Sequence, residues 1–414
     1  MKRLLRMCVW LTVLFPLGTN AWSAGYTFTK IADTTTVGPN GTFSNFDSPA
    51  ISGNTVAFVG GYPGGHGIFT SSGGAFTTIV KRGDPGPAGP YAIVSDPAIS
   101  GDTVAFFGAF GDVLQTVGIF MGSGGPITTI ALRGDPAATN TFSPFGPPAI
   151  SGNTVAFRGG YASSSGPASG IFTGSGGALT TIIQSGNPAP SGAFFNFGEP
   201  SISGDTVAFD AAYDSRGIFT VTGGTVTKIV ELDDPAPVGT FSFVSSPSIS
   251  GDNIAFSGGD QGGDIVFRSK IDGTSIVPTA NVSDVPPGYL FMVRTPPKIS
   301  GDEVAFLGSY SNEDGTLRGE SLFVGDGGPL ETVIATGDAL FGSPVTSLFV
   351  GFPGPGNELG SIGFDPDGSG KLAFRYELAD GRVGIALASI VPEACTFAMI
   401  SVAILVGLTF ARIR

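Results

Sequence analysis

An octet of the form Ile-Ser-Gly-Asx-x-Val-Ala-Phe, with small variations, recurs along this chain at intervals of about fifty residues. Its six copies occupy residues 51–58, 99–106, 150–157, 202–209, 249–256 and 299–306. The alanines of successive copies are 48, 51, 52, 47 and 50 residues apart, and a seventh, stretched copy ends in 371–374. A period of about 40–50 residues that contains several strand signals is typical of the blades of a β-propeller.

Each repeat contains signals for four strands, which the second copy illustrates. Strand A ends in Pro-Ala-Ile (97–99), and Ser-Gly-Asp then forms a tight turn because glycine and Asx tolerate a positive φ. Strand B (103–107) is rich in β-branched and aromatic residues, strand C carries Gly-Ile-Phe (118–120), and strand D carries Thr-Thr-Ile (128–130). Gly-Asp-Pro then ends the unit, since proline cannot continue a strand ladder.

The two ends of the repeat array complement each other. Residues 26–31 match strand D alone, whereas 361–364, 371–376 and 383–388 match strands A, B and C. We therefore predict an all-β fold, a propeller of seven four-stranded blades whose N-terminal strand closes the last blade. The alternatives are six blades or an open β-solenoid. Glycine and proline, 97 of the 414 residues, argue against a mainly helical chain and fit the many turns.

The N-terminus has the pattern of a secretory signal peptide. Three basic residues (Lys2, Arg3 and Arg6) precede an apolar run over 7–17, and Ala-Trp-Ser at 21–23 fits a cleavage site. We predict a signal peptide over 1–23, with Ala21 or Ala24 as other possible last residues. The alternative is an uncleaved anchor, although the apolar run is short for a membrane span.

The C-terminus, residues 391–414, predicts a membrane helix. Val391, Pro392 and Glu393 precede an apolar stretch over 394–411, which is long enough to span a bilayer and ends in Arg412 and Arg414. The terminal arginines would stay in the cytoplasm and leave the repeat domain, residues 24–390, outside.

This arrangement resembles the PEP-CTERM sorting signal, although Ala394 stands where that signal usually has its second proline. The resemblance implies processing by an exosortase in the inner membrane of a Gram-negative bacterium, followed by delivery to the cell surface or extracellular matrix. The alternative is a permanent single-span anchor.

The domain between these ends has no cysteine and is strongly acidic. Cys8 and Cys395 both lie in the predicted signals, so disulfides and cysteine zinc sites are excluded from the domain. Without the five basic residues and one glutamate of the two ends, 15 basic residues stand against 32 acidic ones, a net charge of −17. Such a surface repels nucleic acid and attracts cations or basic partners.

The strand-turn-strand unit resembles the repeats of TolB and WD40 propellers. The whole array, residues 26–390, is similar to bacterial tandem-repeat surface proteins that carry an Asn-and-Gly turn before an Ala-Phe strand and occur with interchangeable C-terminal anchors. The resemblance implies a propeller at the cell surface and brings no enzymatic activity with it.

Repeated acidic and aromatic residues are predicted to meet on one face of the propeller. Aspartates recur in the loops between strands D and A, and aromatic residues, mostly tyrosines, recur four residues after the strand B phenylalanine. The speculative ligand-binding residues are Asp84, Asp135, Asp234, Asp338, Tyr62, Tyr161, Tyr213 and Tyr310. Such a rim would bind polysaccharide by stacking and hydrogen bonding, or bind cations. The alternative is that the aspartates cap turns and the aromatic rings fill gaps between blades.

One strand A to strand B turn is longer than the others. Asp365, Asp367 and Ser369 lie at alternate positions before a glycine, which resembles the start of a calcium loop. Position twelve is Tyr376 instead of glutamate. We therefore predict no cofactor other than a possible Ca²⁺ ion at these three residues.

The sequence contains no recognisable catalytic constellation. Its one histidine, His66, lies in a loop without a repeated partner, and no phosphate loop, zinc spacing or nucleophile elbow is present. The favoured interpretation is a non-enzymatic surface or matrix protein that binds polysaccharide, cations or another surface protein. The alternatives are an extracellular lyase or glycosidase that uses loop carboxylates, and a passive spacer.

Overall fold

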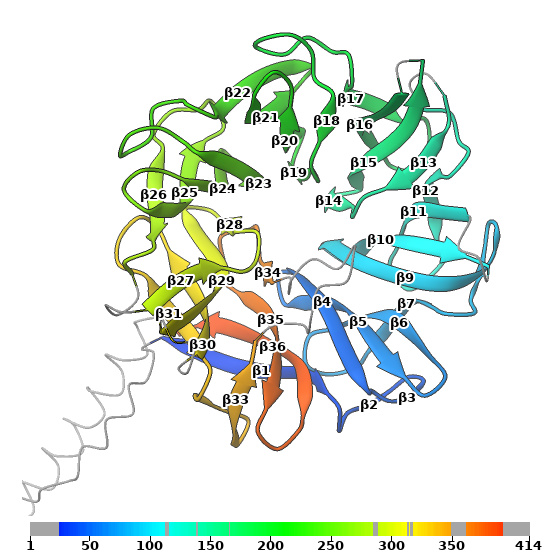
Figure 1. Cartoon of the computed structure of the whole chain (residues 1–414). Coiled ribbons are helices and arrows are strands. Elements are labelled where there is room, and N and C mark those ends of the chain that lie inside the picture. Colours follow the sequence, from blue (N-terminus) through cyan, green and yellow to red (C-terminus); the bar gives the residue numbers. More distant parts are fainter. Residues whose placement is uncertain are drawn as a thin grey trace, which may run out of the picture.

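The computed structural model describes residues 25–111, 116–137, 140–164, 166–284, 289–312, 314, 318–348 and 362–391. These residues contain strands and turns but no helix. Seven antiparallel sheets surround a central axis, and one short hairpin, β2 (Val37–Gly38) with β3 (Gly41–Thr42), lies outside them (Figure 1). The predicted seven-bladed propeller is confirmed, and the six-bladed and open-solenoid alternatives are wrong.

Blades 1 to 6 consist of strands A to D in chain order from the axis outward, and blade 7 takes its outermost strand from the N-terminus. Blade 1 contains β4 (Asn45–Ser52), β5 (Thr55–Tyr62), β6 (Gly65–Ser71) and β7 (Thr77–Lys81). Blade 2 contains β9 (Gly89–Ser100), β10 (Thr103–Phe110), β11 (Thr116–Gly122) and β12 (Thr128–Leu132), with β8 (Pro85–Gly86) beside β9. Blade 3 contains β13 (Phe142–Phe145), β14 (Ala149–Ser151), β15 (Thr154–Ser163), β16 (Gly166–Gly174) and β17 (Thr180–Gln184). Blade 4 contains β18 (Asn196–Phe197), β19 (Ser201–Ser203), β20 (Thr206–Ala212), β21 (Arg216–Thr222) and β22 (Thr225–Glu231).

The remaining three blades follow the same order. Blade 5 contains β23 (Phe243–Ser250), β24 (Asn253–Gly259), β25 (Asp264–Lys270) and β26 (Val277–Asn281). Blade 6 contains β27 (Tyr289–Val293), β28 (Lys298–Ser300), β29 (Glu303–Asn312), β30 (Arg318–Gly325) and β31 (Glu331–Ala335). Blade 7 contains β32 (Ala339–Leu340), β33 (Ser343–Ser347), β34 (Gly363–Phe364), β35 (Leu372–Leu378), β36 (Val383–Ile390) and β1 (Tyr26–Asp33).

The N-terminal strand closes the ring as the sequence predicts. β1 pairs antiparallel with β36 from Tyr26 opposite Ile390 to Asp33 opposite Gly384, with a bulge between Lys30 and Ala32. Figure 1 shows this blue strand beside the orange to red strands of blade 7. Closure pairs two strand edges that would otherwise be exposed.

The recurring octet builds the core because its apolar residues pack within and between blades. The alanine of every copy, from Ala57 to Ala373, is fully buried, as is the phenylalanine that follows it. The strand B phenylalanine packs on the strand C phenylalanine of its own blade; Phe256 and Phe267, for example, stack with their centroids 5.5 Å apart. The alanine instead joins the apolar cluster of the neighbouring blade, as Ala57 does with Val104 and Phe106. A small side chain at this position therefore lets adjacent sheets approach.

The innermost strands are less regular than expected. Strand A is split in two in blades 3, 4, 6 and 7, and in blade 2 it carries a register shift beside Asp96, whose φ is +52°. A proline precedes the last residues of strand A in blades 1 to 6. Proline is tolerated there because one edge of strand A faces the axis and pairs with no other strand.

The predicted export signals lie largely outside the described residues. Val391 is described, and its N–H donates to the Gly25 carbonyl at 2.5 Å, but the signal peptide over 1–23 and residues 392–414, with Pro392, Glu393, Arg412 and Arg414, are not. Within the described part of the chain, no helix is long and apolar enough to cross a membrane.

Candidate functional site: the central channel

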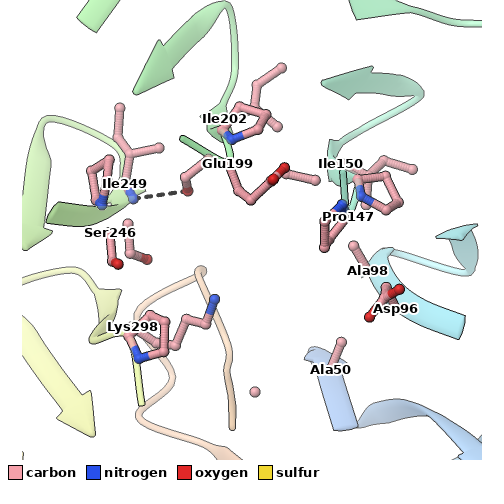
Figure 2. Close-up of a pocket in the computed structure, with 18 of the residues that line it drawn as sticks. Ala50, Asp96, Ala98, Pro147, Ile150, Glu199, Ile202, Ser246, Ile249 and Lys298 are labelled. Carbon is pink, nitrogen blue, oxygen red and sulfur yellow. Dashed lines mark hydrogen bonds between the residues drawn. The ribbon is translucent and has the colours of Figure 1, made fainter. Parts of the chain in front are cut away.

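A cavity of about 630 Å³ lies where the inner strands of all seven blades converge. Its wall repeats the end of strand A, with a proline, a small residue and an isoleucine from most blades, such as Pro97, Ala98 and Ile99 in blade 2. Figure 2 shows these segments arranged around the opening. The volume lies in the range of small-molecule binding sites. We call this cavity the central channel.

The backbone of the channel wall offers few donors to a ligand. The prolines have no N–H group. In blades 5 and 6 the isoleucine N–H is already bonded to a serine of the preceding blade: Ile249 donates to the Ser201 hydroxyl at 3.1 Å, and Ile299 donates to Ser248 at 3.3 Å. Figure 2 marks the first of these bonds. At these positions the backbone therefore offers no N–H donor to a ligand.

Two ion pairs lie on the wall formed by blades 3 and 4. Arg158 Nε is 2.9 Å from Glu199 Oε1, which links the two blades, and Arg216 pairs with the almost fully buried Asp210 within blade 4. Figure 2 shows Glu199 extending from blade 4 toward the inner strand of blade 3.

Two glycines make room for these carboxylates. A Cβ added at Gly146 would lie 1.9 Å from Glu199 Oε2, and one at Gly198 would lie 2.0 Å from Asp210 Oδ1. Neither position could hold a side chain without moving the ion pair beside it.

Lys298, Asp47 and Asp96 bring further charges to the channel. Lys298 takes the place that alanine or serine holds in blades 1 to 5. Asp96 comes directly before the proline of blade 2, and its carboxylate accepts a hydrogen bond from the Ser95 hydroxyl at 2.7 Å. The lining thus contains three basic and four acidic side chains, whereas the whole chain is strongly acidic.

The predicted rim aspartates lie in the loops between blades, and each caps its own turn. Their side chains accept a hydrogen bond from the backbone N–H three residues earlier: Asp84 from Lys81 (3.0 Å), Asp135 from Leu132 (2.8 Å), Asp234 from Glu231 (3.0 Å) and Asp338 from Ala335 (2.8 Å). Asn187 does the same for Gln184 at 2.8 Å. The structure distributes these aspartates around the ring and does not bring them together.

The predicted rim tyrosines pack mainly into the blades. Tyr161 and Tyr213 are 4% and 3% exposed, and their rings contact the strand C phenylalanines Phe172 and Phe219. Tyr62 packs on Phe69 in the same way and is partly buried, as is Tyr310. A glycan could not stack on Tyr161 or Tyr213 in this conformation, and ligand binding at the other two stays a prediction.

His66 makes a structural contact between blades 1 and 2. Its Nε2 accepts a hydrogen bond from the Val94 N–H at 3.3 Å. Burial lowers the pKa of His66, and the nearby Arg82 charge lowers it further. A neutral imidazole can accept this bond, whereas a protonated one cannot.

The loop proposed for calcium completes a ring of hydrogen bonds. In six successive contacts, the serine that ends strand A accepts a bond from the glycine N–H in the next blade's turn between strands A and B. The pairs are Ser52–Gly101, Ser100–Gly152, Ser151–Gly204, Ser203–Gly251, Ser250–Gly301 and Ser300–Gly368, at 2.9 to 3.2 Å. Asp365 takes the serine's place in blade 7, where the nearby Gly53 N–H acts to lower the pKa of its carboxyl. We call this set the A–B turn ring.

Hydrogen bonds also join Ser369 to both aspartates of this loop. The Ser369 hydroxyl donates to Asp365 Oδ2 at 2.9 Å, and the Ser369 N–H donates to Asp367 Oδ1 at 2.8 Å. Burial raises the pKa of Asp365, and the neighbouring Asp367 carboxyl also raises it. The hydrogen bond from Ser369 lowers this pKa but does not outweigh the rise. Among the described residues, no three His, Cys, Asp or Glu side chains form a group that could hold a metal. Calcium at Asp365, Asp367 and Ser369 stays a prediction.

Comparison with known proteins gives a fold but little about activity. A family of unknown function, DUF7453, matches residues 111–216. A search among curated proteins finds no match. The acylaminoacyl peptidase of Pyrococcus horikoshii is similar in structure, with a TM-score of 0.51, 14% identity, and coverage of 86% of this chain and 53% of the peptidase. This chain therefore spans about half the length of that peptidase.

Two further solved structures are more distant in shape. The β-propeller domain of the Trilobed protease from Pyrococcus furiosus has a TM-score of 0.36 at 13% identity, over 70% of this chain and 97% of that domain. A sialidase from Trypanosoma rangeli has a TM-score of 0.37 at 10% identity, over 90% of this chain and 60% of the sialidase.

Sequence reasoning located the strands of the central channel but missed its ion pairs. The Pro-Ala-Ile pattern predicts strand structure alone, and the site residues predicted from the sequence lie elsewhere in the repeat. A signal was present: Arg158 and Asp210 directly follow the octet phenylalanine, where blades 1, 2 and 6 have Val59, Phe107 and Leu307.

Proposed function

We propose that the protein is an exported cell-surface or extracellular-matrix propeller that binds a polysaccharide in its central channel. The observation that carries this proposal is the cavity of about 630 Å³, which is lined by all seven blades and by the Arg158–Glu199 and Arg216–Asp210 pairs. The volume lies in the range of small-molecule binding sites, and the placed charged side chains would fix the orientation of a ligand.

The sequence supports the extracellular location and the non-enzymatic role. The signal pattern over 1–23 and the PEP-CTERM-like tail favour export and processing by an exosortase. The one histidine, His66, is not among the residues that line the channel. Membrane contact is proposed only for the C-terminal helix before processing, and no nucleic-acid partner is proposed for so acidic a chain.

A glycan array and calorimetric titration of residues 25–391, which contain all seven sheets, test this function. We expect saturable binding of a polysaccharide fragment without turnover. Absence of binding, with or without calcium, would contradict the binding role. Release of shortened products would instead support the alternative of a lyase or glycosidase.

A further inference from the structure

Three basic residues, Arg158, Arg216 and Lys298, line the central channel. The predicted mature domain has 15 basic and 32 acidic residues, yet the channel lining has three basic and four acidic ones. The channel is therefore close to neutral within a molecule that repels anions elsewhere. An anionic ligand would meet less repulsion in the channel than on most of the surface.

Each acidic residue that blades 3 and 4 bring to the channel pairs with an arginine. Arg158 bonds to Glu199 through its Nε, and Arg216 bonds to Asp210 through one terminal nitrogen. Each guanidinium group has five N–H donors, so each of these bonds uses one of them. The Arg216 side chain is 51% exposed and lines the cavity, so a ligand can reach its guanidinium group.

Parts of the remaining wall have no free backbone N–H donor. Its prolines have no N–H, and the Ile249 and Ile299 N–H groups already bond to serines. Arg158, Arg216 and Lys298 bring side-chain donors to the wall. Arginine binds carboxylate groups through two parallel hydrogen bonds, which gives both strength and geometric specificity.

We propose that the central channel binds an acidic saccharide, a sugar unit that carries a carboxylate, with Arg216 as its main anion-binding residue and Lys298 and Arg158 as supporting charges. This inference rests on the proposed function, since it names the class of polysaccharide. The aliphatic faces of the prolines and isoleucines contact the sugar ring, and the basic side chains contact its carboxylate.

The test compares two ligands that differ only in charge. Calorimetry measures binding of oligogalacturonate and of the same oligomer with its carboxylates methyl-esterified, together with a sulfated oligosaccharide. We expect the free acid to bind at least about tenfold more tightly than the ester, and its affinity to fall with added salt. Tighter binding of the sulfated oligomer than of the free acid would overturn the assignment to carboxylate.

Equal affinity for acid and ester would overturn the acidic-saccharide inference and leave the proposed function intact. Absence of binding to all three oligomers, and to every glycan of the array, would overturn both.

Variants then locate the site. Arg216→Ala should weaken binding of the free acid about tenfold or more and leave the ester unaffected. The double variant Arg216→Gln with Asp210→Asn removes the ion pair without leaving a buried charge, and it should show the same loss. Arg133→Ala, an exposed arginine in a loop outside the channel, is the matched control and should bind normally. Normal binding by the folded double variant would overturn the assignment to this channel.

Discussion

At the scale of single residues, the repeated polar side chains serve the turns in which they lie. Asp84, Asp135, Asp234 and Asp338 accept a backbone N–H three residues earlier, and Asn187 fills the same role in the loop that leads into blade 4. A repeat gives every blade the same turn, so it repeats the residue that the turn requires. Repetition of an acidic residue is therefore weak evidence for a ligand.

The first prediction concerns this cap. Asp135→Ala should lower the free energy of unfolding by about 1 kcal/mol, because the Leu132 N–H loses its acceptor. Asp135→Asn should cost much less, since Asn187 already makes the equivalent bond elsewhere in the chain. Urea unfolding followed by circular dichroism measures both variants. Equal losses for Ala and Asn would show that the charge, and not the acceptor, matters.

A second prediction concerns Asp33, which is fully buried at the end of the closing strand. Burial by itself would raise the pKa of Asp33, but hydrogen bonds from Thr35, Lys30 and Thr36 outweigh burial and hold the pKa below its ordinary value. The ionised carboxylate is therefore favoured in the folded state. It stabilises the fold above the unfolded pKa of about 3.9, and this contribution disappears as the pH falls through the lower folded value.

Asp33→Asn should therefore be less stable than the parent at pH 7, and the difference should shrink steadily below about pH 4. Thermal unfolding across pH 2.5 to 7 measures this dependence. Asp47→Asn, on the inner strand of blade 1 and outside the closing strand, is the control. A stability difference that stays constant with pH would contradict the assignment.

At the scale of strands, closure depends on two segments at opposite ends of the chain. β1 forms seven residue pairs with β36, and its Ile31 and Ala32 join the apolar cluster of blade 1. Two ion pairs also stabilise the end of the strand. Lys30 and Arg382 lie 3.1 and 3.7 Å from the Asp33 carboxylate. The closing strand therefore contributes backbone pairing, packing and electrostatics together.

A chain that begins at Thr34 tests this element. It should unfold at a clearly lower temperature than the parent, because blade 7 loses its outer strand and the edge of β36 becomes exposed. A synthetic peptide of residues 25–33 should restore the unfolding temperature by adding a strand at that edge. The same peptide with Ala32→Asp should fail, since Ala32 is fully buried. Unchanged stability of the shortened chain would contradict this role.

At the scale of the whole molecule, the A–B turn ring links each blade to the next on the face opposite the D–A loops. Six serines accept glycine N–H groups around the axis, and the Asp365 carboxyl lies near the Gly53 N–H in the seventh place. Blade 7 joins this ring through its lengthened turn, where the Ser300 hydroxyl also donates to the Asp365 carbonyl and Ser250 donates to the Pro366 carbonyl. The irregular loop thus contributes to closing the ring.

Asp365→Ala should lower the free energy of unfolding by about 1–3 kcal/mol, because the half-buried Ser369 hydroxyl loses its acceptor and the Gly53 N–H loses the nearby carboxyl. Asp365→Ser should retain part of this stability, since serine fills that place in the other six blades. Calcium titration of the parent in the same assay tests the metal hypothesis separately. A rise in unfolding temperature with calcium that is absent in Asp365→Ala would favour a calcium site.

The sequence alone determined the features that each repeat carries within itself. Strand order, turn chemistry, the number of blades and the closing role of β1 all follow from local alternation and from an octet that recurs every fifty residues. These features depend on residues near one another in the chain, so they can be read from the sequence pattern.

The tertiary structure alone decided which residues of different blades meet. Glu199 reaches Arg158, 41 positions away, only because Gly146 leaves room for it, and Asp365 reaches the Gly53 turn only because the ring closes. A side chain's contacts across a blade interface depend on sheet twist and spacing, which no local pattern specifies.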